Sequence, residues 1–244
     1  MKIIATVEAR MASSRLPGKI LLPLCGKPSL ERLVERARRS RYLADVVIAT
    51  TINPADDTVG YWARECGISV FRGSEDDVLL RVLGAARHFN ADILVELTGD
   101  CPLIDPAIID QLIELYQSGD YDYVSNVLER TYPRGLDTQV FSTAVLQEVE
   151  RTTQDPADRE NVSLYIYEHP ERFKLGGIQA PAELHAPELR ICVDREEDYE
   201  VVKAVYEALY FKNQSFTSCD VVKFLKTHPE ITARNAHVRQ KAVR

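Results

Sequence analysis

The stretch Glu8-Ala9-Arg10-Met11-Ala12-Ser13-Ser14-Arg15-Leu16-Pro17-Gly18-Lys19 follows a short apolar run at residues 3–7. The apolar run predicts a buried strand, and a helix pattern begins soon afterwards, near residue 28. The stretch itself is a loop with three cations, two serines and a Pro-Gly turn. Backbone N–H groups, hydroxyls and cations at the end of a strand are typical of a phosphate-binding loop. A basic surface loop is the alternative interpretation, and the density of cations and serines favours phosphate binding.

Strands and helices alternate through the first half of the chain. Strands are expected at 2–8, 45–51, 68–71 and 91–97, and helices at 28–40, 53–66, 75–90 and 105–118. This order predicts an α/β fold, in which a Rossmann-like, mostly parallel sheet carries helices on both faces. Ligands of such sheets bind beyond the carboxyl ends of the strands. The loops from Glu8 to Lys19 and from Thr98 to Leu103 both leave such ends, so we expect them to meet in one site.

The second half has shorter elements. Strands are expected at 121–126, 138–141, 173–180 and 189–193, and helices at 142–151, 155–169, 195–210 and 218–227. Because no linker divides the chain, we expect a single domain over 1–244, with an inserted α+β region at about 120–185. The basic tail, 229–244, is expected to be frayed or ordered only on contact. The charged residues of the first helix are expected to face solvent: Arg32, Glu35, Arg36, Arg38 and Arg39.

Composition excludes several classes of protein. The 244 residues carry a net charge of −7, which makes a general nucleic-acid surface unexpected. Five scattered cysteines without a CxxC pattern favour a reduced, cytoplasmic protein without disulfides or a zinc site, and the five histidines lie in separate segments. We expect no signal peptide and no membrane span, because no apolar run of about 18 residues occurs.

Two aspartates are candidates for holding a metal ion. Asp100 and Asp194 each end a predicted strand. Mg²⁺ prefers one or two protein carboxylates together with phosphate oxygens and water. Alternatively, Asp100 caps the turn before Pro102, and Asp194 caps the helix that follows it. Asp198 is then either a supporting carboxylate or a helix-start charge. Together with the cationic loop, the two aspartates favour a site for metal-assisted nucleotidyl transfer.

These segments closely resemble the CMP-sugar synthetases, which include the sialic-acid and Kdo cytidylyltransferases. The greatest similarity is to the spore-coat-polysaccharide F-type cytidylyltransferases. The similarity begins with the loop at 9–19 and ends at about residue 210. Between them it runs through the segments 71–79, 97–103, 132–137, 158–162 and 190–199. The resemblance implies the fold of the nucleotide-diphospho-sugar transferases. It also implies the transfer of CMP from CTP to a sugar, with Mg²⁺ as cofactor and release of pyrophosphate.

The resemblance also implies a role for each matching residue. It implies catalytic roles for Arg15, Lys19 and Asp100, and metal binding by Asp100 and Asp194. It implies nucleotide binding by Arg10, Met11, Ser13, Ser14, Arg15, Gly18, Lys19, Arg72, Ser74, Thr98 and Gly99. The acceptor sugar would contact Arg134, Asp137 and Gln139. Gln139 stands where many relatives carry Glu, and Thr98 stands where Kdo enzymes carry Gln.

The acceptor implied by the family is an acidic nonulosonate-type sugar or a related sugar phosphate, used in cell-surface or spore-coat polysaccharide biosynthesis. A homodimer is expected through the inserted region. Its aromatic residues are expected to anchor the interface, and the alternative is that they are internal core: Tyr121, Tyr123, Tyr132, Tyr165, Tyr167 and Phe173. The cationic loop is expected to be exposed, so that loss of its charges leaves stability nearly unchanged.

Two other functions are consistent with parts of the pattern. A GT-A-type glycosyltransferase would share the nucleotide-binding half, but a DxD motif is expected after the fourth strand and the sequence there is Gly99-Asp100-Cys101-Pro102. A non-catalytic nucleotide-sugar-binding protein is the second alternative. The intact set of Arg15, Lys19, Asp100 and Asp194 favours an enzyme.

Overall fold

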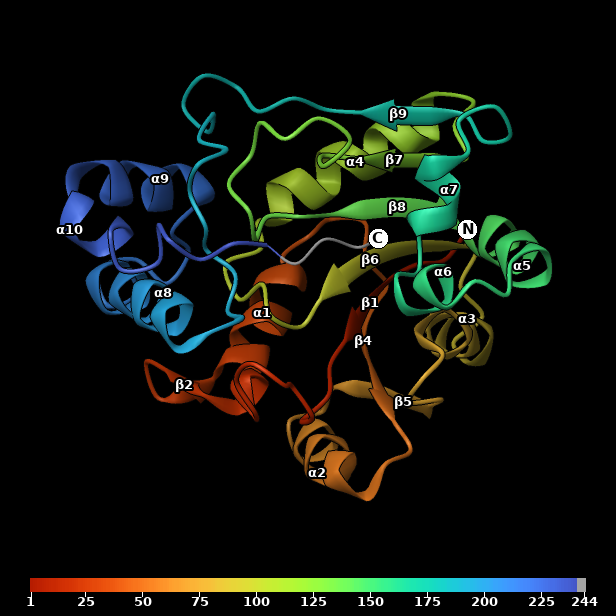
Figure 1. Ribbon diagram of the computed structural model, residues 1–244, viewed down its shortest axis with the longest axis horizontal. Coiled ribbons are helices and arrows are strands. Elements are labelled where there is room, and N and C mark those ends of the chain that lie inside the picture. Colours follow the sequence, from red (N-terminus) through yellow and green to blue (C-terminus); the bar gives the residue numbers. More distant parts are fainter. Residues whose placement is uncertain (241–244) are drawn as a thin grey trace.

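A seven-stranded sheet runs through the computed structural model, which describes residues 1–240 (Figure 1). The strand order is β5-β4-β1-β6-β8-β7-β9. The bounds are β1 (Ile3–Glu8), β4 (Asp45–Thr51), β5 (Ser69–Gly73), β6 (Ile93–Thr98), β7 (Tyr123–Ser125), β8 (Gln139–Ser142) and β9 (Leu175–Gly177). Only β8 runs antiparallel to its neighbours, β6 and β7. The predicted mixed, mostly parallel sheet is therefore confirmed. A separate hairpin is formed by β2 (Pro23–Leu24) and β3 (Lys27–Pro28).

Helices cover both faces of this sheet, as predicted. One face packs against α1 (Ser29–Ala37), α2 (Asp57–Glu65), α4 (Pro106–Ser118), α8 (Glu196–Leu209) and α9 (Ser218–Thr227). The other packs against α3 (Val78–His88), α5 (Thr143–Thr152) and α7 (Leu164–Glu168), with α6 (Pro156–Glu160) beside α3. Short helical turns complete the fold: η1 (Lys19–Leu21), η2 (Pro54–Asp56) and α10 (Pro229–Thr232). Among residues 1–240, we find no helix with the length and apolar character needed to cross a membrane.

Alternation along β1 shows how the sheet separates its two faces. Ala5 and Val7 lie in the core beneath α1, whereas Ile4 lies in the core beneath α3. Successive side chains of a strand point to opposite faces. Thr6 and Glu8 therefore follow Ile4 onto the α3 face, which brings a carboxylate to the end of a buried strand.

The expectation that the charged side of the first helix faces solvent is wrong for Arg32 and Arg36, whereas Arg38 and Arg39 are exposed as expected. Arg32 and Arg36 are buried. Arg32 donates to the carbonyls of Leu24 and Cys25 and stacks over the Tyr210 ring at 4.1 Å. Arg36 donates to two carbonyls and lies over an aromatic ring in the same way. Carbonyls and aromatic faces satisfy these guanidiniums, so they join the loops to the C-terminal helices.

Three predicted elements differ in the structure. Residues 189–193 form no strand; Arg190 makes an isolated bridge to Arg134 instead. The helix predicted over 155–169 is two short helices, because the chain leaves helical geometry at Asn161. The strand predicted at 173–180 is only three residues long.

Three of the proposed interface aromatics belong to the core. Tyr123, Tyr132 and Phe173 are at most 2% exposed, so they are not available as anchors for a second subunit. Their rings fill the space between the sheet and its helices. Tyr121, Tyr165 and Tyr167 are half-buried.

Candidate active site

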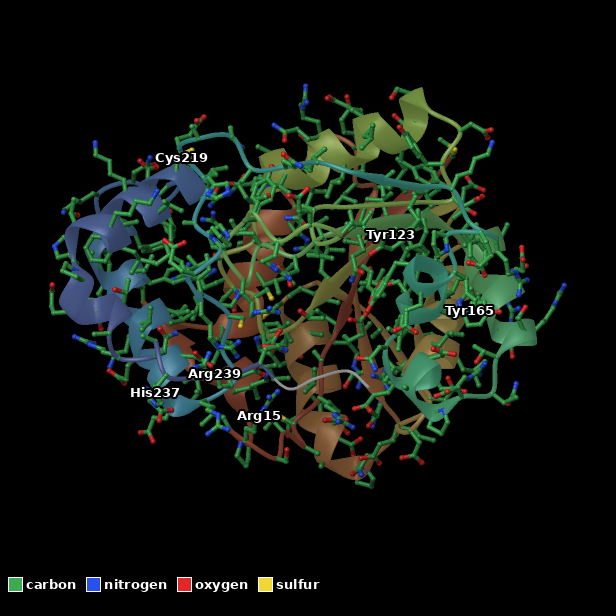
Figure 2. All side chains as sticks on the ribbon, turned by 45° about the horizontal axis from the view of Figure 1, so that its top comes forward. Arg15, Tyr123, Tyr165, Cys219, His237 and Arg239 are labelled. Atoms are coloured by element: carbon green, nitrogen blue, oxygen red, sulfur yellow. The ribbon has the colours of Figure 1, made fainter. Side chains whose placement is uncertain are left out.

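A cavity of about 1210 Å³ opens at the carboxyl ends of β1 and β6. Its lining joins the N-terminal loop, both strand ends, the turn before β8, the segment between α6 and α7, and the C-terminal segment. Arg15 and Arg239, both labelled in Figure 2, come from opposite ends of the chain, and both line this cavity. The predicted site residues found in the lining are Arg10, Ser13, Ser14, Arg15, Lys19, Thr98, Gly99, Asp100, Arg134, Asp137, Gln139 and Asp194.

Met11 and Gly18 shape the loop from outside the cavity lining. The Met11 carbonyl accepts hydrogen bonds from the backbone N–H groups of Ser13 and Gly18, at 2.9 and 3.0 Å. The Met11 N–H donates to Asp56 Oδ1 at 2.6 Å. Gly18 adopts a φ of 70°, a left-handed conformation that favours glycine. These contacts fold the loop back so that its cations face the strand ends.

Asp100 and Asp194 meet at one ammonium group. Lys19 Nζ donates to Asp100 Oδ2 at 3.0 Å and to Asp194 Oδ1 at 2.8 Å. Arg15 Nη2 also donates to Asp194 Oδ1, at 2.8 Å, and Arg190 Nη2 donates to Asp194 Oδ2 at 2.6 Å. The expected meeting of the two aspartates above the loop is confirmed. The result is a compact cluster of alternating charges at the base of the cavity.

The cluster keeps Asp194 and Lys19 in their charged forms. Burial alone would raise the pKa of Asp194, but Lys19 and Arg15 outweigh it and lower that pKa to about 2. Burial would lower the pKa of Lys19, and the two aspartates raise it instead. The Lys19 side chain is only 13% exposed, so the expectation of an exposed loop is wrong at this residue. Its ammonium is buried because two carboxylates compensate for the lost water.

The lowered pKa predicts how Asp194→Asn changes stability with pH. The carboxyl group of the unfolded chain titrates near the ordinary aspartate pKa of 3.8, so the stability that wild type has over the variant is fully present above that pH. The difference in the free energy of unfolding between wild type and Asp194→Asn should be on the order of 2 kcal/mol. As the pH falls through about 2, the folded carboxylate is protonated and the advantage is lost. Urea unfolding at pH 7, 4 and 2.5 measures the difference, with Asp76→Asn as an exposed control; equal differences at all three values would contradict the assignment.

Asp198 supports this cluster from behind, and both of its proposed roles are present. It is fully buried. One oxygen accepts from the backbone N–H groups of Asp194 and Arg195, which caps α8. The other accepts from Arg190 Nε and Asn235 Nδ2, both at 2.9 Å. Arg190 is thereby aimed at Asp194, a positioning role that no sequence motif indicated.

The C-terminal segment over residues 229–240 makes specific contacts with the rest of the chain, which agrees with the expected alternative of order on contact and not with a frayed tail. Asn235 is 3% exposed and donates to the Arg190 carbonyl at 3.0 Å. Gln240 Oε1 accepts from Arg190 Nη1 at 2.7 Å. Arg239 and Gln240 line the cavity, and Figure 1 shows the chain returning from the C-terminal helices toward the middle of the sheet. The remaining part of the predicted tail, residues 241–244, lies outside the described residues.

The acceptor-side candidates are also brought to the cavity. Asp137 is paired with Arg130, with N–O distances of 2.5 and 3.0 Å, and the sequence analysis missed Arg130. Gln139 Oε1 accepts from Tyr123 at 2.6 Å and from Ser163 at 2.7 Å. The Arg134 side chain lines the cavity while its backbone pairs with the 189–191 segment.

Two glycines allow the segments around the site to approach one another. A Cβ at Gly99 would lie 2.7 Å from the Glu8 carbonyl oxygen. Gly135 has a φ of 112°, and its Cβ would lie 2.6 Å from the Cys192 backbone nitrogen. Only glycine permits these contacts, which place the strand end and the acceptor-side turn against the site.

Arg72 and Ser74 are not brought to the cavity. Arg72 donates to the carbonyls of Thr51 and Asn53 and pairs with Asp57 at 2.5 Å. The Ser74 hydroxyl accepts from the Asp77 N–H. Both residues instead hold the end of β5 against its neighbouring loops.

Glu8, Glu96 and Arg81 line the cavity, and the sequence analysis assigned them no role. Burial raises the pKa of Glu8, and the neighbouring charge of Glu96 raises it further. Burial raises the pKa of Glu96 to about 7. The period-two pattern of β1 and β6 could have indicated that both carboxylates share one face of the sheet.

The donor set fits a metal site completed by a ligand. Asp100 and Asp194 offer two carboxylates, the hard oxygen ligands that Mg²⁺ prefers. No group of three or more His, Cys, Asp or Glu side chains within residues 1–240 is arranged to hold a metal ion. The two carboxylates would therefore need phosphate oxygens and water to complete a magnesium site.

Comparison with known proteins agrees with this geometry. The cytidylyltransferase family model matches residues 4–225. The chain therefore belongs to the cytidylyltransferase family and is a nucleotidyltransferase of the CMP-sugar synthetase type. A cytidylyltransferase from Leptospira borgpetersenii has a similar structure, with a TM-score of 0.89 and 35% identity over 99% of this chain and 100% of that chain.

Two curated relatives narrow the similarity. The spore coat polysaccharide biosynthesis protein SpsF of Bacillus subtilis is 32% identical over 93% of this chain and 95% of its own. A 3-deoxy-manno-octulosonate cytidylyltransferase of Geobacter sulfurreducens is 39% identical over 46% of this chain and 44% of its own. The first similarity spans nearly the whole chain, whereas the second covers less than half of it.

Proposed function

We propose that the chain transfers CMP from CTP to an acidic sugar or a sugar phosphate, with release of pyrophosphate, in the biosynthesis of a cell-surface or spore-coat polysaccharide. The observation that carries the proposal is the contact of Lys19 Nζ with both Asp100 and Asp194, beside Arg15, at the base of the cavity. Five free cysteines are consistent with the cytoplasm, in which we place the reaction.

The chain's own residues can support this transfer. The acceptor oxygen attacks the α-phosphorus, the bond from that phosphorus to the oxygen bridging the α- and β-phosphates breaks, and a hydroxyl acceptor gives up its proton to water. The pair of electrons leaves with pyrophosphate. Arg15 and Lys19 would stabilise the charge that develops on the phosphate oxygens, and such positioning and electrostatics account for most of the catalysis in phosphoryl-type transfer. Ser13 and Ser14 would donate hydrogen bonds to the triphosphate.

We propose Mg²⁺ as the cofactor, held by Asp100 and Asp194. When bound, it supplies positive charge to the phosphate oxygens. Asp194 is now neutralised by Lys19, Arg15 and Arg190. A triphosphate would offer Lys19 and Arg15 new anionic partners, so its entry would free carboxylate oxygens for the metal.

Pyrophosphate release distinguishes this proposal from the two alternatives. A GT-A-type glycosyltransferase would release a nucleoside diphosphate or monophosphate from a nucleotide sugar, and a binding protein would release nothing. The experiment offers CTP, UTP, GTP and ATP with candidate acidic sugars and sugar phosphates and measures pyrophosphate. Release that needs both CTP and an acceptor supports the proposal, and its absence from every combination would refute it.

Arg239 is expected to contribute to binding of the triphosphate. It places an additional cation in the lining of the cavity that Arg15 also lines. Arg239→Ala should raise the KM for CTP about fivefold, the scale of one partly exposed charge interaction, and leave kcat nearly unchanged. Arg234→Ala, an exposed change in the same segment, is the control. Equal KM values for wild type and Arg239→Ala would remove Arg239 from the site.

We also propose a homodimer through the inserted region. Tyr121, Tyr165 and Tyr167 remain as half-buried aromatics there, a type of residue enriched at interfaces. Light scattering at micromolar concentration should give twice the chain mass of 27.6 kDa. A single-chain mass would contradict the dimer.

A further inference from the structure

Glu8 and Glu96 bring two carboxylates to one wall of the cavity. The register of β1 and β6 pairs Glu8 with Thr98 and Thr6 with Glu96, so the two glutamates are diagonal neighbours on the same face. Both line the cavity. Glu96 is 5% exposed. Glu8 Oε1 and Glu96 Oε2 are buried and have no hydrogen-bond partner among residues 1–240.

Arg81 is the cation beside this pair, but its guanidinium donates to backbone carbonyls and not to the two carboxylates. Its side chain is buried, and its Nη1 donates to the Ser74 carbonyl at 2.5 Å and to the Glu75 carbonyl at 3.4 Å. Its Nε is buried and has no hydrogen-bond partner in the part of the chain that the structure describes. Buried polar groups are nearly always hydrogen-bonded, and leaving them unpaired is costly. Three unpaired groups on residues around one cavity therefore point to a ligand.

Charge identifies the kind of ligand. Two carboxylates and one guanidinium need one more positive charge to be neutral. We propose that Glu8 and Glu96 form an amine subsite, which binds the ammonium group of an amino-bearing acceptor sugar. The inference rests on the proposed function, since it assigns the chemical class of that function's acceptor.

The protonation of Glu8 and Glu96 without a ligand is consistent with an amine subsite. Burial raises the pKa of both carboxyl groups, so near pH 7 the pair retains a proton that an ammonium group would displace. The other charged and polar groups around the pair are Arg10 and Asp100 at the strand ends, Arg81 from α3, Gln139 from β8, and Ser163 before α7. A hydroxyl or an acetamido group could donate a hydrogen bond but would supply no charge. Discrimination by one charge-assisted hydrogen bond is commonly about tenfold or more.

The experiment compares acceptors that differ in one substituent. An octulosonate, a nonulosonate and a hexose 1-phosphate are each offered with CTP in hydroxy, amino and N-acetyl forms, and pyrophosphate release is measured at pH 7. We expect kcat/KM for the amino form to exceed that for the hydroxy form by about tenfold or more on at least one scaffold. Glu8→Gln and Glu96→Gln should bring this ratio close to one. Glu160→Gln, an exposed carboxylate of the same lining, should not change it.

A binding measurement separates this inference from the proposed function. Glucosamine 1-phosphate and glucose 1-phosphate are titrated calorimetrically into the protein in two buffers of different ionisation heat. The amine should bind more tightly and release a proton, and Glu8→Gln should abolish the release. If the amine binds with proton release but no acceptor yields pyrophosphate, the proposed function is refuted and the amine subsite is retained. Turnover without a preference for amino acceptors, or absence of both amine binding and proton release, would overturn the subsite.

Discussion

Arg15→Ala and Lys19→Ala are each expected to lower kcat by about 10²-fold or more, the usual scale for one electrostatic donor to a developing charge. Arg15 Nη2 and Lys19 Nζ both contact Asp194 Oδ1, so the two cations converge on one point of the cavity. A triphosphate at that point would receive both charges. Pyrophosphate release at saturating CTP measures the loss.

The two variants should differ in stability. The Arg15 side chain is 34% exposed, so its removal should change the free energy of unfolding little. Lys19 lies between two carboxylates, and its removal leaves them facing each other without their shared ammonium. We therefore expect Lys19→Ala to be destabilised by about 1–3 kcal/mol. Arg87→Ala, an exposed change on α3, is the control for activity and stability. Activity of both loop variants within tenfold of wild type would refute the phosphate-binding role.

The fold was predictable because its strongest signals are local. Apolar runs such as Asp45–Thr51 were predicted with the observed bounds, and the alternation of strands and helices determined the parallel sheet. The errors arose where tertiary contacts override local pattern. Arg32 and Arg36 look like a solvated face, yet carbonyls from distant loops satisfy them inside the protein. The expected strand at 189–193 lacks a strand partner and makes one bridge.

The site was predictable where its residues lie on strand ends and in the loop after β1. Asp100 follows the end of β6, next to the end of β1, and the loop after β1 brings Lys19 to the same edge of the sheet. Asp194 reaches Lys19 from a segment that forms no strand, so the predicted strand was wrong although the predicted meeting was right. The C-terminal residues that complete the cavity lie far from any motif, and Arg239 reaches it only because Asn235 anchors the segment on Asp198. Such placement depends on packing and leaves no periodic signal in the sequence.

Asp100→Asn and Asp194→Asn should lower activity and metal dependence together. Each keeps the shape and capping ability of the side chain but removes a charge, so each protein should remain folded. We expect each single variant to lose about 10²-fold or more in kcat, because carboxylate charge is needed to hold Mg²⁺ beside the triphosphate. Titration of Mg²⁺ at saturating CTP should show a raised requirement in both.

The double variant provides the sharper measurement. If both aspartates act on one ion, removal of the second should cost little once the first is gone, so their effects should be strongly non-additive. Asp76→Asn, exposed and outside the cavity lining, should behave as wild type. Fully additive losses with an unchanged Mg²⁺ requirement would mean that the aspartates act separately, through Lys19 and Arg190. The shared contact of Lys19 Nζ with Asp100 and Asp194 favours the coupled result, because any ligand that attracts this ammonium removes one contact from each carboxylate at the same time.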